Sequence, residues 1–275
     1  VDGDDIRVLG RAFDSVSVHL DYQEPRGRVN LFVVHSEEEN YQARVAFEQD
    51  DDVRTLHLDE LVLRFPDERW NLGGPATISW DPDGLTFRDL RLIRPGVGGM
   101  RVQAQGRVPF RGEADFDLSV QGLDVSRVAH VLQLSERIEG VVDVELEVTG
   151  SDVEPVMSGT VSTTDFRFRE YEFERLIAAL DYQGRAATGG IELWKDSVQV
   201  LAVHGAFPLD LAFHSVPDRI PDEAINLVVD AQELPLSLIM APFESYQEVV
   251  GTLSGRVELG GTSESLAPSG QLVVA

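Results

Sequence analysis

The stretch that decides the fold is Val142-Asp-Val-Glu-Leu-Glu-Val148, in which apolar and acidic side chains alternate strictly. Successive side chains of a β-strand point to opposite faces of the sheet, so this pattern predicts a strand with one apolar and one acidic face. The alternation recurs in Ala114-Asp-Phe-Asp-Leu-Ser-Val120, in Val16-Ser-Val-His-Leu-Asp-Tyr22 and in Val257-Glu-Leu259. A chain built from such segments is predicted to be all-β.

Turn-forming residues separate the alternating segments at short intervals. They are Pro25-Arg-Gly27, Asp81-Pro-Asp-Gly84, Pro95-Gly-Val-Gly-Gly99, Arg111-Gly112, Gly150-Ser-Asp152 and Gly189-Gly190. Strands of about six to nine residues with tight turns predict an antiparallel meander. Residues 125–132 and 236–243 have helical spacing of their apolar side chains instead, which predicts two short helices.

Composition excludes several classes of function. The 275 residues include 23 Lys plus Arg against 48 Asp plus Glu, a formal net charge of -25, which argues against binding to nucleic acid. The chain has no cysteine, and its one lysine, Lys195, lies in no phosphate-binding motif. We find no apolar run long enough to span a membrane and no signal peptide, and both ends resemble cuts within a longer protein.

The sequence also repeats internally. The segment from Gly140 to Gly150 aligns with the segment from Gly251 to Gly261 at an offset of 111 residues, and Leu20-Asp-Tyr-Gln23 recurs as Leu180-Asp-Tyr-Gln183 at an offset of 160. An insertion of extra hairpins at about residues 50–100 of the first repeat explains the difference between the offsets. We therefore predict one continuous elongated segment over residues 1–275, with repeats at about 14–162 and 163–275.

The order of several landmarks resembles the TamB-like group of the AsmA-like superfamily from about residue 14 onward. These landmarks are Leu20-Asp-Tyr-Gln23, Trp70-Asn-Leu72, Pro75-Ala76, Gly122-Leu-Asp-Val-Ser126, the segment from Gly140 to Gly150, and the segment from Pro155 to Gly159. Members of this family are anchored in the inner membrane of diderm bacteria. They cross the periplasm as a curled β-sheet with an apolar groove. The resemblance implies that this chain is an internal periplasmic segment of such a protein.

The resemblance further implies a function without catalysis, cofactor or metal. The expected partners are phospholipid acyl chains, which would move along the groove between the membranes, and an Omp85-type outer-membrane barrel reached through parts outside this sequence. The alternative is a β-rich scaffold or chaperone module for the assembly of outer-membrane proteins or autotransporters, acting by strand pairing. We predict that the groove is lined by Phe116, Leu118, Val120, Val142, Val144, Leu146, Val148, Leu253, Val257 and Leu259.

Other interpretations of the same residues remain open or are weak. The apolar faces could instead close on each other as the core of a sandwich or solenoid. Six scattered histidines show no metal-ligand spacing, and the acidic runs at 37–39 and 50–52 lack the spacing of a calcium loop. The glycines at 96–99 lead into a predicted strand where a dinucleotide site needs a helix. Aromatic residues such as Trp70, Trp80 and Trp194 could form a carbohydrate platform, but more often line a core or groove.

Overall fold

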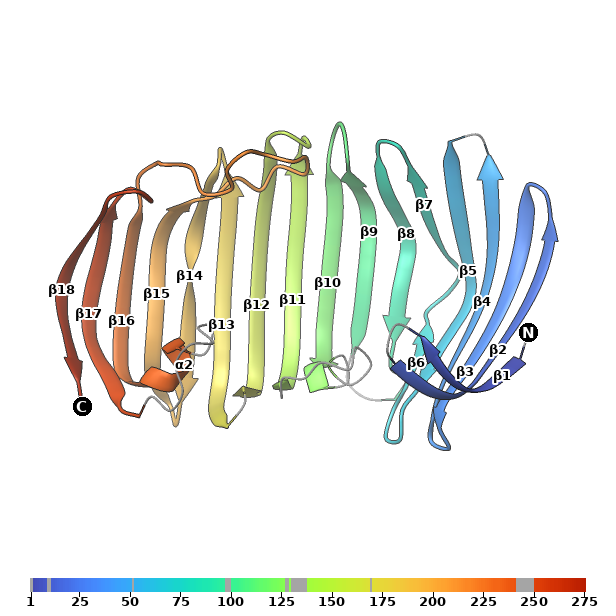
Figure 1. Cartoon of the computed structure of the whole chain (residues 1–275), viewed down its shortest axis with the longest axis horizontal. Helices are drawn as coiled ribbons and strands as arrows, with labels where there is room; N and C mark the ends of the chain where they lie inside the picture. The colour runs from blue at the N-terminus through green and yellow to red at the C-terminus, as the bar shows by residue number, and fades with distance from the viewer. Residues whose placement is uncertain are drawn as a thin grey trace. The chain divides into compact units, whose positions relative to one another are not determined.

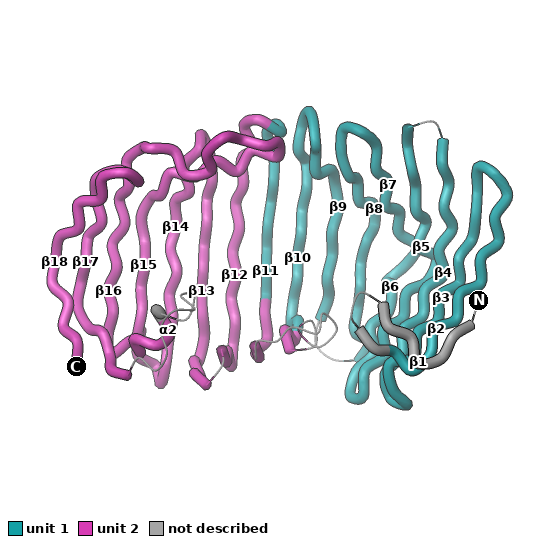
Figure 2. Tube along the Cα trace, viewed as in Figure 1, with its two compact units in different colours: residues 1–123, 143–152 teal, residues 124–142, 153–275 magenta. Residues whose placement is uncertain are grey.

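The computed structural model describes residues 2–8, 11–50, 52–96, 100–126, 129, 138–168, 170–240 and 250–275. It confirms the predicted fold class, because the described chain is almost entirely antiparallel β-strand (Figure 1). The chain divides into two compact units, shown in different colours in Figure 2. Unit 1 comprises residues 1–123 and 143–152, and unit 2 comprises residues 124–142 and 153–275.

Unit 1 is a meander in which consecutive strands form hairpins. Its strands are β1 (Asp2–Val8), β2 (Arg11–Gln23), β3 (Arg26–Ser36), β4 (Glu39–Asp50), β5 (Val53–Arg64), β6 (Arg69–Leu72), β7 (Ala76–Asp81), β8 (Gly84–Ile93), β9 (Arg101–Pro109), β10 (Asp115–Asp124) and most of β11 (Ile138–Gly150). The short strands β6 and β7 share the place of one strand between β5 and β8. The paired strands place the alternating sequence segments side by side.

Unit 2 continues the same type of meander. Its elements are β12 (Pro155–Phe168), β13 (Tyr171–Gln183), β14 (Ala186–Lys195), β15 (Val198–Pro208), β16 (Asn226–Pro235), the helix α2 (Leu236–Met240), β17 (Thr252–Gly261) and β18 (Leu266–Val274). The helix agrees with the start of the helix predicted at 236–243, of which residues 241–243 lie outside the described residues. Most of the helix predicted at 125–132 also lies outside them.

Two details of the sequence prediction are wrong. Strands reach 13 residues in β2 and 14 in β12, longer than the six to nine expected, because they continue through polar positions such as Asp14 and Ser15 in β2 and Thr163 and Thr164 in β12. Gly189-Gly190, predicted as a turn, lies in the middle of β14.

Gly189 is required there by close backbone packing rather than by a turn. Its φ is +151°, and an added Cβ would lie 2.0 Å from the carbonyl oxygen of Ala179 on β13. Gly205 of β15, its direct partner across the ladder, has a φ of +143° and the same conflict with Asn226 at 1.9 Å. Glycines at such backbone angles bend strands, and adjacent bends curve a sheet.

The elements recur at the offsets seen in the sequence. Strand β16 corresponds to β10 at an offset of 111 residues, and β13 corresponds to β2 at an offset of 160. Two isolated bridges also match at the offset of 111, Glu113 with Ser151 and Ala224 with Thr262. Strands β5 to β9 occupy the position of the predicted insertion. The compact units differ from the predicted repeats, because β12 belongs to unit 2.

We predict that Gly205→Ala lowers the free energy of unfolding by about 2 kcal/mol or more, because the methyl group would strike the backbone of β16. The control is Gly260→Ala in β17, whose added Cβ has no neighbour closer than 3.8 Å and should change stability by less than about 0.5 kcal/mol. Urea unfolding monitored by circular dichroism measures both. Equal stability of the two variants would contradict the close approach at Gly205.

Candidate functional site: an apolar face in each unit

Strand register gives unit 1 a continuous apolar face. Val120 of β10 pairs with Val102 of β9, and Val102 pairs with Leu92 of β8. In the same way, Leu20 of β2 pairs with Val29 of β3, and Val29 pairs with Val45 of β4. Because directly paired residues point to the same side of a sheet, the apolar positions of these strands form one surface.

Unit 2 has a corresponding surface. Ile191 of β14 pairs with Val203 of β15, which pairs with Val229 of β16, which in turn pairs with Val257 of β17. Along β13 the face continues through Leu180, which lies opposite Gly189. The opposite side of the same strands carries polar residues, including Asp230 and Arg256, whose side chains form an ion pair at 3.1 Å.

These faces are only partly covered. Leu180 and Ile191 keep 42% and 44% of their surface exposed, although they lie in the interior of their strands. The chain exposes 16817 Å² in all, whereas two separate compact globules of half its 30.4 kDa mass would together expose roughly 14,000 Å². The chain therefore exposes more surface than two closed globules would, and the exposed side chains of Leu180 and Ile191 show that the apolar face of unit 2 is accessible around them.

The structure places all ten predicted groove residues on the apolar sides of three strands. Phe116, Leu118 and Val120 alternate with more polar neighbours on β10, and Val120 is buried. The residues of β11 do the same: Asp143, Glu145 and Glu147 are exposed, whereas the valines and Leu146 are half-buried or buried. The ten are Phe116, Leu118, Val120, Val142, Val144, Leu146, Val148, Leu253, Val257 and Leu259.

Polar contacts align the faces of β10 and β11 within unit 1. The hydroxyl of Ser119 donates to Glu145 at 2.7 Å, and the backbone N–H of Gly122 donates to the carboxylate of Asp143 at 2.7 Å. Since these contacts join the polar sides, Leu118 and Val120 share the opposite side with Val144 and Leu146. Val142 of β11 and the predicted residues of β17 belong to unit 2, so the structure divides the set between the two units.

The sequence prediction missed the apolar residues on the central strands of the unit 2 face. These residues are Leu180, Ile191, Val203 and Val229. In Leu176-Ile-Ala-Ala-Leu180 and in Val200-Leu-Ala-Val203 apolar residues occupy both faces, so alternation alone does not show which side is continuous. A register transferred from the Leu-Asp-Tyr-Gln repeat would have identified Leu180 as the counterpart of Leu20.

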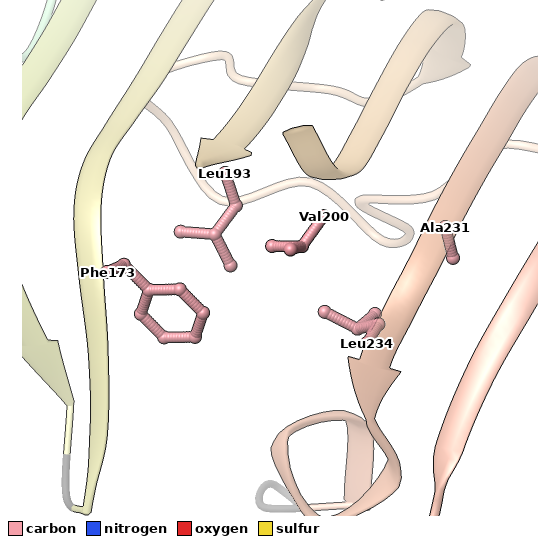
Figure 3. Packing of buried hydrophobic residues seen from close by; sticks show 5 residues of the cluster. All are labelled: Phe173, Leu193, Val200, Ala231 and Leu234. Atoms are coloured by element: carbon pink, nitrogen blue, oxygen red, sulfur yellow. The ribbon is translucent and has the colours of Figure 1, made fainter. Parts of the chain in front are cut away.

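Helix α2 covers one end of the unit 2 face. Phe173, Leu193, Val200, Ala231 and Leu234 form a buried cluster there, and Figure 3 shows Phe173, Leu193, Val200 and Leu234 converging. Leu238 of α2 packs against this cluster, and the hydroxyls of Tyr171 and Ser237 are hydrogen-bonded. This is the one closed hydrophobic cluster among the described residues, and it marks a rim of the face.

The segment between β15 and β16, residues 209–225, closes the other end and is called the strap below. It passes across the ends of β13 and β14 (Figure 1). Tyr182 of β13 lies beneath it with 2% of its surface exposed, and its hydroxyl accepts a hydrogen bond from the backbone N–H of Leu211 at 2.9 Å. Ala212 of the strap is also buried.

The matching end of unit 1 is open. Tyr22, the counterpart of Tyr182, keeps 60% of its surface exposed and stacks on Phe47 with the rings 5.8 Å apart. The ring of Phe47 lies over Gly27, where any Cβ would collide with it. Strand β4 ends at Asp50 and β5 already begins at Val53. The connection is therefore too short to form a strap like the one in unit 2.

Three described residues have shifted pKa values: Tyr41 lies on the apolar side of β4, where it pairs with Val33 of β3, whereas Asp81 ends β7 and Asp222 lies in the strap. Burial and the neighbouring Glu39 carboxylate raise the pKa of the Tyr41 phenol, which therefore stays protonated and donates to Glu39. The guanidinium of Arg107 lowers the pKa of Asp81. Hydrogen bonds from Thr262, Glu264 and Ser263 lower the pKa of Asp222 in the strap.

The described residues do not assemble the other candidate sites. No group of three or more His, Asp or Glu side chains among them is placed to hold a metal ion. Of the aromatic residues considered for a carbohydrate platform, Trp70 and Trp80 belong to unit 1, and Trp194 belongs to unit 2, where the guanidinium of Arg175 lies 4.3 Å from the centre of its ring.

Comparisons with protein-family models, with curated proteins and with solved structures found no match to this chain. No helix within the described ranges has the length and apolar character needed to cross a bilayer.

Truncation of a leucine side chain to alanine should affect stability differently at the covered rim and on the open part of the face. We expect Leu234→Ala to destabilise the protein by about 2–4 kcal/mol, because it leaves a cavity in the buried cluster. Leu180→Ala, on the same face but exposed, should cost less than about 1 kcal/mol. Urea unfolding of the two variants gives the comparison, and a loss at Leu180 as large as at Leu234 would show that the face is closed.

Proposed function

We propose that the apolar faces bind phospholipid acyl chains, and that this chain is a periplasmic segment of a TamB-like bridge protein that carries lipid between the inner and outer membranes. The observation that supports this most strongly is the accessibility of a continuous apolar face, shown by exposed Leu180 and Ile191 between the two covered rims of unit 2. A sandwich core would bury these residues.

The chemistry of the faces suits a chain that moves. Aliphatic side chains give an acyl chain about 0.8 kcal/mol per buried CH₂. In Ile191, Val203, Val229 and Val257 the face offers branched aliphatic groups without a hydrogen-bonding group that would fix a ligand at one point. Headgroups would stay in water beside the face. An acyl chain can then shift along the face with little change in free energy.

The periplasmic location, the inner-membrane anchor and the Omp85-type partner rest on the order of landmarks in the sequence. The alternative, a scaffold for outer-membrane protein assembly, would use strand edges instead of the faces. It predicts that proline substitutions in the edge strand β18 impair function more than charges on the apolar face do.

The decisive variants are neighbours on one strand. Val229 points to the apolar face of β16, between Val203 and Val257, whereas Val228 points to the polar face, between His204 and Glu258. We predict that the purified protein carries phospholipid, that Val229→Asp loses most of it, and that Val228→Asp retains it, because a carboxylate in an apolar path is costly. Native mass spectrometry and solvent extraction measure the bound lipid.

Val144→Asp on β11 tests the face of unit 1 in the same way. Circular dichroism must first show that each variant is folded. Wild-type protein that binds no phospholipid, or equal lipid content in Val229→Asp and Val228→Asp, would refute lipid binding by the faces and leave the scaffold role as the better explanation.

A further inference from the structure

The strap is held to the sheet by a few contacts rather than by a strand ladder. The backbone N–H of Leu209 donates to the carbonyl of Arg185 at 2.9 Å, and that of Ile225 donates to the carbonyl of Gly261 at 2.9 Å. Arg219 donates to the backbone carbonyls of Asp210, Ala212 and His214 at 2.9, 2.6 and 3.0 Å, so one guanidinium folds the strap on itself. Arg185 at the β13–β14 turn lies 3.4 Å from the carboxylate of Asp210. The Arg219 contacts therefore lie within the strap, and the ion pair of Arg185 with Asp210 joins the strap to the sheet.

The far end of the strap has contacts of its own, besides an ion pair of Glu223 with the same Arg185 at 3.7 Å. Asp222 accepts a hydrogen bond from the backbone N–H of Glu264 at 3.2 Å, and Ser263 donates to the carbonyl of Pro221 at 3.2 Å. This anchor lies beside the entry into β16. Opening of the segment next to Tyr182 therefore breaks the Leu211 hydrogen bond and the ion pairs of Arg185, while the contacts of Asp222 and Ser263 keep the end beside β16 in place.

Unit 1 shows that the sheet forms without a strap. Strands β2, β3 and β4 pair as β13, β14 and β15 do, with Tyr22 opposite Gly27 where unit 2 has Tyr182 opposite Ala187. Yet Tyr22 is exposed and Tyr182 is buried. Opening of the strap therefore breaks the contacts of the strap and leaves the strands paired.

We propose that the strap is a latch: it closes the Tyr182 end of the unit 2 face and opens to let an acyl chain enter. This inference rests on the proposed function. Tyr182 and Ala187, uncovered when the latch opens, extend the path that runs through Leu180 and Ile191. The helix α2 keeps the opposite rim closed, so lipid enters this unit at the strap end.

Hydrogen exchange tests whether the strap opens on its own. In the full chain, the strap amides should exchange faster than those of β13 to β15. Arg219→Gln should accelerate exchange at Leu211 and Ala212 by about tenfold or more without changing the strands. Tyr182→Phe, which removes the acceptor of the Leu211 N–H, should do the same, whereas Tyr22→Phe in unit 1 should not. Exchange of the strap only together with the strands would overturn the latch.

A cross-link tests whether opening admits lipid. The chain has no native cysteine, so Arg185→Cys with Asp210→Cys introduces one pair of thiols. A short bifunctional reagent can join them and fix the start of the strap, next to Leu211, to the β13–β14 turn. With vesicles containing pyrene-labelled phosphatidylethanolamine, the cross-linked protein should take up lipid about tenfold more slowly than the same variant before cross-linking. Equal uptake by both forms overturns the latch while lipid binding stands. Absence of uptake in every form, wild type included, refutes the proposed function itself, and the entry route proposed here with it.

Discussion

The constraint on which the structure depends is the register between neighbouring strands. A shift of one residue would turn the apolar side chains of a strand to the polar side, because side chains alternate along a strand. Pairs such as Val203 with Val229 keep the apolar positions of unit 2 together, and ion pairs such as Arg256 with Asp230 favour the same register from the other side. The face therefore follows from pairing alone, without a second layer to define it.

An apolar face that is exposed to water is unfavourable in free energy, and a second layer of structure would normally cover it. In unit 2 the two ends of the face are closed by α2 and the strap, while the strands between them keep Leu180 and Ile191 exposed. Glycines within the strands, such as Gly189 and Gly205, bend the backbone where they meet. A bent sheet brings its apolar side chains closer together, which reduces exposure and still leaves room for an aliphatic ligand.

Alternation in the sequence was sufficient to predict the fold class and the side of the strand on which each of the ten residues lies, because segments such as Val142 to Val148 separate their two sides completely. It was insufficient where both sides are apolar, as in β13 and β15. It also misassigned Gly189-Gly190. Gly189 is needed because a Cβ would strike the carbonyl oxygen of Ala179, and the sequence alone does not distinguish this requirement from that of a turn. Burial of Tyr182 depends on the distant Leu211, which no local pattern near Leu-Asp-Tyr-Gln shows.

The two occurrences of Leu-Asp-Tyr-Gln show how one sheet edge acquires different access. After the equivalent strands β4 and β15, unit 1 continues with β5, which pairs with β4 and extends the sheet, whereas unit 2 folds back over its own strand ends as the strap. The aromatic ring is the same, but its exposed fraction falls from 60% at Tyr22 to 2% at Tyr182. Access to the apolar face is therefore set by the segment that follows the third strand of each repeat, and it can change without any change in the strands that form the face.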